Sequence, residues 1–258
     1  MTRSESIYDS PRLAAGYAFG RPPVHQHILE TVGKHIHTTV RPERALDVGC
    51  GAGLSTAPLE PLAETVVGLE PVPTMLTHSR VVAPSALFLV APAERLPFSA
   101  GVFDLMTAAG SLNYADLSLF LPDAARVLAP GGLLAIYDFS AGRRLRGNDL
   151  LDKWYISFER RYPPPPGYFL DVVGLDYARA GLRLEACEEF EVATPMTLSS
   201  YLRYAKSETN VELAISRGVP ESEIHTWCRS TLEEVFDDEP REVLFDAYVA
   251  YVRREGNS

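Results

Sequence analysis

The sequence predicts an α/β protein with a doubly wound, mostly parallel Rossmann-like sheet, an antiparallel last strand and a helical cover inserted before that strand. Short apolar runs alternate with helical segments between residues 44 and 138. Runs of Leu, Val, Ala and Ile joined by helices are typical of parallel strands that are covered on both faces. A glycine-rich turn follows the first of these runs, and residues 241–254 are apolar enough to return as the last strand.

The elements can be assigned in order along the chain. From Pro22 onward an apolar residue recurs at every fourth position, which predicts an amphipathic helix with the stripe Val24, Ile28, Val32, Ile36 and Val40. Strands are expected near 44–48, 65–69, 86–90, 102–108 and 132–138, with helices near 54–62, 73–80 and 117–128. A helix near 171–180, a strand near 182–192 and a largely helical stretch over 197–237 precede the final strand.

Charge and composition exclude several classes of partner. The formal net charge is −10, and nucleic acids are bound largely through Lys and Arg, so we expect no nucleic acid partner. An anionic membrane surface is disfavoured for the same reason, and no stretch is long and apolar enough to span a bilayer. The N-terminus lacks the apolar core of a signal peptide, so we expect a cytoplasmic protein. Cys50, Cys187 and Cys228 are too few and too far apart for a disulfide framework.

A glycine-rich loop stands where the first strand is expected to turn into a helix. The stretch ALDVGCGAGLS carries Asp47, Gly49, Gly51 and Gly53. Glycines there let the backbone approach a ligand and adopt positive φ angles. The spacing differs from the G-x-G-x-x-G of dinucleotide enzymes, and Asp47 would stand unfavourably beside a pyrophosphate. S-adenosylmethionine, which has an ammonium group, a sulfonium and no phosphate, suits this acidic loop better than NAD does.

An acidic residue ends the next expected strand. Glu70 closes the run TVVGLE and lies 21 residues after Gly49, since 70 − 49 = 21. An acid at this place can accept hydrogen bonds from both hydroxyls of a ribose. Glu70 could instead cap the next helix or be solvated, but behind this glycine loop we favour ribose binding.

From the glycine loop to residue 140 the sequence resembles the class I S-adenosylmethionine-dependent methyltransferases. The later motifs of that family follow in order as APAERLPF at 91–98, FDLMTAAGSLNYAD at 103–116 and ARVLAPGGLLAIYDF at 125–139. Within the class the chain is similar to the small-molecule branch that contains the ubiquinone-biosynthesis and trans-aconitate methyltransferases. The resemblance implies an enzyme with S-adenosyl-L-methionine as its cofactor and a small-molecule methyl acceptor as its partner.

The resemblance also implies roles for single residues around the cofactor. The three loop glycines would line its amino acid moiety and ribose, Glu70 would hold the ribose hydroxyls, and Asp47 would orient the loop or the ammonium. The other implied contacts are Pro71, Met75 and the backbone N–H of Ala93 at the adenine, and Gly110 at the methionyl end. Many relatives have Asp where this chain has Pro92, so Glu94 or a backbone carbonyl would have to accept from the adenine amino group.

The phrase GYAFGRPP near the N-terminus resembles the segment that closes over the cofactor in this branch. Tyr17 is therefore a candidate for stacking and Arg21 for holding the cofactor carboxylate, with an ordinary surface role as the alternative. We expect one methyltransferase domain over 1–258. Its cofactor-binding core would span 22–140, and 141–170 and 197–237 would be insertions that cover the substrate.

Candidates for the acceptor site follow the fourth strand and fill the insertions. Asn113 and Tyr114 stand where open α/β sheets bind ligands, and the resemblance implies that this position faces the transferring methyl group. No general base can be assigned there. An aromatic roof could be formed by Trp154, Tyr155, Phe158, Tyr162, Tyr201 and Tyr204, although aromatics at such spacings are usually core. A carboxylate on the acceptor could be clamped by Arg143, Arg144, Arg160, Arg161 and Arg203, unless these only pair with nearby acids.

The function that these observations favour is methyl transfer to a small metabolite, on the oxygen of a hydroxyl or a carboxylate. Transfer to carbon or nitrogen, a protein that binds S-adenosylmethionine without catalysis, and a nicotinamide oxidoreductase are the alternatives. The histidines His25, His27, His35 and His37 are expected to form a solvated helix face, because positions i and i+2 of a helix diverge by roughly 200°. No metal site is expected.

Overall fold

The structure is a computed structural model that describes residues 6–36, 41–166, 170–237 and 239–256. In these ranges it has an eight-stranded sheet of order β3-β2-β1-β4-β5-β8-β6, with β7 paired to β8. The parallel strands are β1 (Arg44–Val48), β2 (Thr65–Glu70), β3 (Leu87–Val90), β4 (Phe103–Ala109) and β5 (Leu128–Phe139). β8 (Arg241–Arg254) runs antiparallel to β5, to β6 (Arg144–Leu145) and to β7 (Leu182–Met196). The predicted fold class, including the antiparallel last strand, is confirmed.

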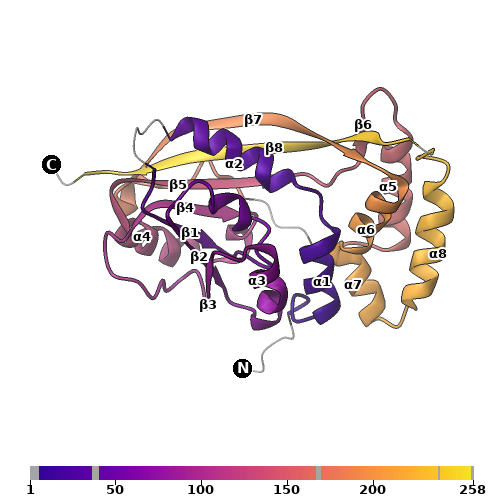
Figure 1. Cartoon of the computed structure of the whole chain (residues 1–258), viewed down its shortest axis with the longest axis horizontal. Coiled ribbons are helices and arrows are strands. Elements are labelled where there is room, and N and C mark those ends of the chain that lie inside the picture. The colour runs from indigo at the N-terminus through magenta and orange to yellow at the C-terminus, as the bar shows by residue number, and fades with distance from the viewer. Residues whose placement is uncertain (1–5, 37–40, 167–169, 238, 257–258) are drawn as a thin grey trace.

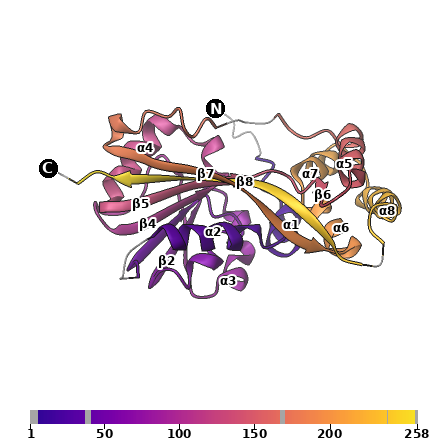
Figure 2. The ribbon, with the colours of Figure 1, turned by 90° about the horizontal axis from the view of Figure 1, so that it is seen from above.

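Helices cover both faces of the parallel strands, and the two faces have separate cores. Leu133, Ala135 and Tyr137 of β5 point into the core that contains α2 (Val24–His35). Leu134 and Ile136 point the other way, into the core that contains α4 (Leu117–Val127). Figure 2 shows α2 and α4 on opposite sides of the sheet. This alternation explains why the parallel strands are apolar without interruption, as the sequence predicts.

A group of four helices lies beyond one end of the parallel strands. This helical group consists of α5 (Leu150–Arg161), α6 (Leu198–Lys206), α7 (Thr209–Ser216) and α8 (Glu221–Leu232). β7 and β8 extend from the sheet to reach it, and α1 (Pro11–Gly20) lies between it and the parallel strands (Figure 1). The helical group is built from the predicted insertions 141–170 and 197–237. That these insertions cover a substrate stays a prediction.

Three of the predicted helices are shorter or of a different type. Residues 54–62 contain only the 3-10 helix η1 (Ala57–Leu59), and 171–180 contain only η4 (Ala178–Ala180). Residues 73–80 form the 3-10 helix η2 (Pro73–His78), which continues into α3 (Ser79–Val82). A proline explains the first case: Pro61 has no N–H to donate, so an α-helical ladder cannot pass through it.

The N-terminal helix α1 has no counterpart among the predicted elements. Ser10 caps it by accepting a hydrogen bond from the Leu13 N–H at 3.2 Å, and Pro11 occupies the first helical position. The stripe predicted from Pro22 onward is confirmed at Val24, Ile28 and Val32, which are fully buried. The last residue of that stripe, Val40, lies outside the described residues.

Candidate functional site

The carboxyl ends of four parallel strands bring four site residues into one row. Val48 of β1 pairs with Leu69 of β2 and with Ala108 of β4, and Ala109 pairs with Tyr137 of β5. Along the sheet order β2-β1-β4-β5, Glu70 and Gly49 are in register with Ala109 and Tyr137, and Gly110 and Asp138 come one residue further along β4 and β5. Glu70, Gly49, Gly110 and Asp138 therefore form a row that is staggered by one residue. At about 4.8 Å per strand step the row is about 14 Å long. Such an edge is where open α/β sheets bind ligands.

The glycine loop turns sharply as it leaves β1. The N–H groups of Gly49 and Cys50 both donate to the Leu69 carbonyl, at 2.7 and 3.1 Å, which holds the loop over the end of β2. Gly49, Gly51 and Gly53 have φ angles of +71°, +54° and +93°, which residues with a side chain rarely adopt. A Cβ at Gly49 would also collide with the side chain of Ser111. The loop therefore needs glycine for both its conformation and its close packing.

Asp47 supports this loop from inside the protein. Its carboxylate is fully buried and accepts hydrogen bonds from three hydroxyls, Ser55 Oγ and Thr56 Oγ1 at 2.7 Å and Thr107 Oγ1 at 2.9 Å. Burial raises the pKa of Asp47, and the three hydroxyl donors lower it in part. Of the two roles that the resemblance implies, the geometry fits the orientation of the loop, because the carboxylate is enclosed by its donors.

Glu70 joins the glycine loop to the segment after β2. Its Oε2 accepts the Gly51 N–H and its Oε1 accepts the Val72 N–H, both at 3.0 Å. The residue is 7% exposed. Burial raises its pKa, while the two backbone donors lower it. Each carboxylate oxygen has two lone pairs, so one acceptor position on each oxygen is still available for a ligand hydroxyl.

The residues implied at the adenine lie on the β2–β3 side of the loop. Met75 is buried against it, since a Cβ at Gly51 would lie 3.5 Å from Met75 Cε. Pro71 is exposed, and Ala93 is half-buried in the segment after β3. Glu94 accepts the Asp116 N–H at 3.0 Å, at the start of α4. Beside them Ala91, Pro92, Leu96 and Phe98 line a shallow hollow at the end of β3.

Arg21 and Tyr17 form part of a buried cluster rather than an ordinary surface. Arg21 pairs with Glu208 at 2.9 Å and donates to the Ser207 carbonyl at 3.0 Å. Its guanidinium lies 4.3 Å from the centre of the Tyr17 ring and 5.3 Å from that of Tyr204. Two of its nitrogens thus have protein partners, and Nε is buried without one. A cofactor carboxylate would have to share Arg21 with Glu208.

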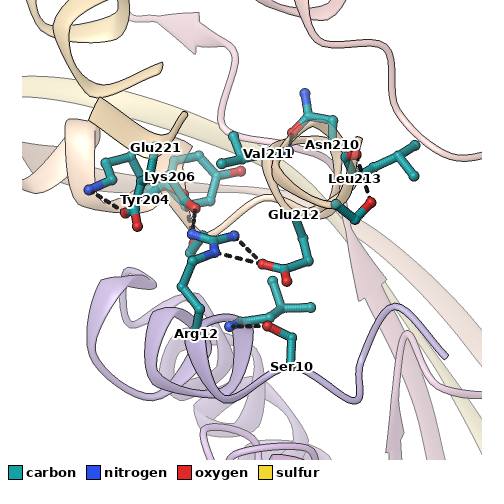
Figure 3. A network of polar contacts seen from close by, with 12 residues as sticks. Ser10, Arg12, Tyr204, Lys206, Asn210, Val211, Glu212, Leu213 and Glu221 are labelled. Carbon is teal, nitrogen blue, oxygen red and sulfur yellow. Dashed lines mark hydrogen bonds and ion pairs between the residues drawn. The ribbon is translucent and has the colours of Figure 1, made fainter. Parts of the chain in front are cut away.

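Helix α1 connects the segment after β2 to the helical group. On one side Arg12 donates to Glu212 at 2.6 Å and to the Lys206 carbonyl at 3.1 Å, as Figure 3 shows. On the other side Thr74 of η2 donates to Asp9 just before α1. The segment of α1 therefore contacts both η2, which follows β2, and the helical group.

Two predicted acceptor residues lie at the β4 end of the row. The Asn113 amide donates to Asp138 Oδ2 at 3.5 Å, and the Tyr114 hydroxyl lies 3.0 Å from the Tyr8 hydroxyl. Tyr114 is 58% exposed. Asp138 was not predicted as a site residue, although it lies within the motif at 125–139 and is the last residue but one of a parallel strand.

The proposed aromatic roof is packed as the core of the helical group. Trp154 donates to Thr231 Oγ1 at 2.8 Å, the Tyr201 hydroxyl donates to the Gly142 carbonyl at 2.7 Å, and Tyr204 accepts the Gly142 N–H at 3.0 Å. The buried aromatics of this group are Trp154, Tyr155, Phe158, Tyr162, Tyr201 and Tyr204. Their burial and satisfied polar atoms fit the core alternative.

Four of the five arginines that were candidates for the carboxylate clamp have partners within the protein. Arg161 pairs with Glu223 at 3.0 Å, and Arg143 pairs with Asp152 at 2.9 Å. Arg144 pairs with Asp246 and with Glu191, and Arg203 donates to Ser199 Oγ at 3.1 Å on the exposed side of α6. These contacts fit pairing with nearby groups better than a carboxylate clamp.

Two histidines differ from the predicted solvated face. His25 Nδ1 lies 3.1 Å from the Tyr137 hydroxyl, and burial lowers the pKa of His25 to about 4. His35 stacks on the Tyr251 ring with centroids 3.6 Å apart. The solvated-face interpretation is therefore wrong for both, because their side chains contact Tyr137 of β5 and Tyr251 of β8. His27 is exposed, and His37 lies outside the described residues.

The described ranges contain neither a cluster of metal ligands nor a membrane-spanning helix. Within them, no three His, Cys, Asp or Glu side chains are grouped so as to hold a metal ion. None of the helices that the structure describes has the length and hydropathy needed to cross a membrane.

Comparison with known proteins places the central part of the chain in a family. Residues 46–136 match the family model described as "Methyltransferase domain". An uncharacterized methyltransferase of Synechocystis is 34% identical over 131 residues, which are 49% of this chain and 59% of the relative. Residues 46–136 are a class I methyltransferase domain. The predicted resemblance is confirmed for this part of the chain.

Two further comparisons extend this result. A ubiquinone biosynthesis O-methyltransferase of Rhizobium etli is 29% identical over 123 residues, which are 46% of this chain and 45% of the relative. The chain therefore spans roughly half the length of the curated relatives that it matches. The structure titled a putative type II methyltransferase from Anaeromyxobacter dehalogenans has a TM-score of 0.71 at 19% identity, covering 90% of this chain and 97% of its own. That likeness supports the methyltransferase fold over nearly the whole chain.

Proposed function

We propose that the protein transfers a methyl group from S-adenosylmethionine to a small-molecule acceptor, on the oxygen of a hydroxyl or a carboxylate. The observation that carries the proposal is the glycine loop with Glu70 bound across it. The family match includes this loop, since it begins at residue 46. The name of the Rhizobium relative, an O-methyltransferase of ubiquinone biosynthesis, supports an oxygen acceptor.

The residues at the edge fit S-adenosylmethionine better than a dinucleotide. Glu70 keeps acceptor positions for ribose hydroxyls, and the glycines leave room for an amino acid end against the loop backbone. Asp47 and Glu70 bring two acidic groups close to the loop, where the pyrophosphate of NAD would meet them. A cofactor that carries a sulfonium and an ammonium is favoured by the same charges.

The protein's contribution to the reaction is alignment and exclusion of water. When bound, S-adenosylmethionine supplies an electrophilic methyl group on a sulfonium. Glu70 and the loop would fix the ribose and the amino acid end, so that the methyl group is held at the β4 end of the row. α1 and the helical group would close the edge against water. Alignment in such a site can supply several kcal/mol without a covalent intermediate.

The acceptor is proposed to be a small, partly aromatic or apolar metabolite. The net charge of −10 disfavours a polyanion such as nucleic acid. The helical group lies beyond the ends of the parallel strands, with α1 between them (Figure 1), and this supports an enclosed site for a small acceptor.

Calorimetry and a product assay test the proposal together. S-adenosylmethionine and S-adenosylhomocysteine should both bind, and NADH should bind more weakly than either. Incubation with S-adenosylmethionine and a metabolite library should then release S-adenosylhomocysteine with some acceptors. Tighter binding of NADH would refute the cofactor assignment. Binding of S-adenosylmethionine without turnover of any acceptor would favour a non-catalytic binder, and methyl groups found only on carbon or nitrogen would refute the oxygen acceptor.

A further inference from the structure

Asp138 stands at the far end of the site row from Glu70. It follows Tyr137 in β5, and Tyr137 pairs with Ala109, the last residue of β4, so that Gly110 comes next on the neighbouring strand. The two are so close that a Cβ at Gly110 would lie 2.8 Å from Asp138 Oδ1. The glycine therefore leaves the Asp138 carboxylate against the bare backbone of the β4 end. Of the residues in the row, this is the acid that the cofactor assignment does not use.

The contacts of the Asp138 carboxylate leave one oxygen weakly held. Oδ1 accepts the Phe139 N–H at 2.8 Å. Among the described residues, Oδ2 accepts only the Asn113 amide, at 3.5 Å, which is the outer limit for a hydrogen bond. Both donors are neutral. Oδ2 therefore has an acceptor position that the protein does not fill strongly.

The groups around Asp138 on the other packed elements are also uncharged. Tyr248 of β8 is the register partner of Asp138, and burial, together with the charge of Asp138, raises the pKa of Tyr248 to about 12. Tyr137, next to it in β5, has its pKa raised by burial and by the charges of Asp47 and Asp138. Burial is the largest influence on Asp138 itself and raises its pKa. A carboxylate with a raised pKa is a stronger base than one in water.

Strand order gives the position of Asp138 relative to a bound cofactor, and this step rests on the proposed function. Glu70 on β2 would hold the ribose, and the sulfonium is joined to the ribose through one methylene group. The sulfonium would therefore lie one or two strand steps from Glu70, over β1 or β4. Its methyl group, directed away from the ribose, then faces the β4–β5 end of the row. The row ends there with Asp138.

The geometry points to Asp138 as the carboxylate that faces the transferring methyl group and takes the proton of a hydroxyl acceptor. In the step, the O–H bond of the acceptor breaks and its proton goes to Asp138 Oδ2. A lone pair of that oxygen forms the new O–CH₃ bond, and the electron pair of the broken C–S bond stays on sulfur.

This assignment narrows the acceptor from "hydroxyl or carboxylate" to hydroxyl. A hydroxyl needs a base before or during methyl transfer, whereas a carboxylate is already ionised and needs none. An acceptor carboxylate at this place would also be repelled by the negative charge of Asp138, whose hydrogen-bond donors within the described residues, Asn113 and the Phe139 N–H, are both neutral. Asp138 would therefore select acceptors that have a proton to give.

The position of Asp138 can be tested without an acceptor. S-adenosylmethionine carries the sulfonium charge and S-adenosylhomocysteine does not, so a carboxylate beside the methyl group favours the former. Asp138→Asn should lower the preference for S-adenosylmethionine by about tenfold, as the ratio of two Kd values from calorimetry. Its affinity for neutral S-adenosylhomocysteine should be unchanged, which shows that the variant is folded. Asp237→Asn is the control: it removes the same charge from an exposed ion pair with Arg241 and should not change the ratio.

The base role is tested by the release of S-adenosylhomocysteine with paired probes, phenol against benzoate and catechol against phthalate. The hydroxyl probes should react in the wild type, Asp138→Asn should lower their kcat by about 10²–10⁴-fold, and Asp138→Glu should restore part of it. An unchanged Kd ratio, equal rates in Asp138→Asn, or faster methylation of the carboxylate probes would each overturn the assignment. If none of the probes reacts, the Kd ratio decides it. Failure of both cofactor forms to bind would instead refute the proposed function.

Discussion

Glu70 is expected to stabilise the glycine loop in the free protein and to bind the ribose in the cofactor complex. These two roles should depend on pH in opposite directions. Its carboxylate links Gly51 and Val72 through one backbone hydrogen bond each. Glu70→Ala would leave both N–H groups unpaired and would remove the acceptors proposed for the ribose. Loss of such contacts at a buried site costs about 1–3 kcal/mol, so the Kd for S-adenosylmethionine should rise roughly 5- to 150-fold.

The sign of the pH dependence follows from the direction of the pKa shift. Burial raises the pKa of Glu70 above its unfolded value, so folding favours the protonated form. The stability that this gives is present below the unfolded pKa and is lost as pH rises through the folded pKa. Cofactor affinity should change in the opposite direction, because ribose hydroxyls donate best to the ionised carboxylate. Rising pH should thus lower the free energy of unfolding while it tightens binding.

The assay is calorimetric titration with S-adenosylmethionine, alongside urea unfolding, over the acidic range up to neutral pH. Glu70→Gln should flatten both pH dependences. Glu60→Gln is the matched control, because Glu60 also accepts a backbone N–H, that of Ser85 at 2.7 Å, but lies away from the site row. If Glu70→Ala binds S-adenosylmethionine as tightly as the control does, the ribose role is refuted. If only stability changes, Glu70 acts on the loop alone.

Three further predictions concern the loop, the buried cluster and the histidine behind the sheet. Gly49→Ala should abolish cofactor binding and should lower the free energy of unfolding by more than Gly131→Ala does. Gly131 has the same left-handed strain, at φ +76°, but open space around it. Equal losses of stability in the two variants would refute the packing argument. Arg21→Met should cost about 3–5 kcal/mol in urea unfolding, because it leaves Glu208 buried without its partner, and a loss under 1 kcal/mol would contradict this. Burial lowers the pKa of His25 from 6.5 to about 4, so folding favours its neutral form. Stability should therefore be lost as pH falls from 6.5 toward 4. The loss should be at most roughly 3 kcal/mol, at about 1.36 kcal/mol per pH unit. His25→Asn should remove that loss, and an unchanged pH profile would show that His25 is solvated.

The parallel core could be predicted from sequence because its signals are local. Each strand from β1 to β5 is an apolar run bounded by turns, and each expected boundary lies within a few residues of the observed one. The glycine loop was predictable for the same reason, since positive φ angles restrict the residue type at Gly49, Gly51 and Gly53 directly. The row from Glu70 to Asp138 depends instead on register between strands, which no single run of sequence contains.

The functions of the charged and aromatic residues were harder to predict, because each depends on what the fold brings near. Arg21 lies 187 positions from Glu208 in sequence, since 208 − 21 = 187, and the two meet only when α1 packs on α6 and α7. The stretch with Trp154 looks the same in sequence whether it lines a pocket or fills a core. Only the contacts of Trp154 with Thr231 and Phe158 distinguish the two.

A general base could not be assigned from the sequence, because the sequence does not show which residue lies beside the end of β4. The sequence predicted Asn113 and Tyr114 as acceptor-site residues, because they follow β4. Neither side chain is a useful base at neutral pH. The next strand in the sheet, β5, is also the next along the chain, so its last residues return to the same edge beside them. An acid there meets the end of β4 only if the residue opposite has no side chain. Gly110 satisfies this condition, so the chemistry of Asp138 depends on a glycine 28 residues before it, since 138 − 110 = 28.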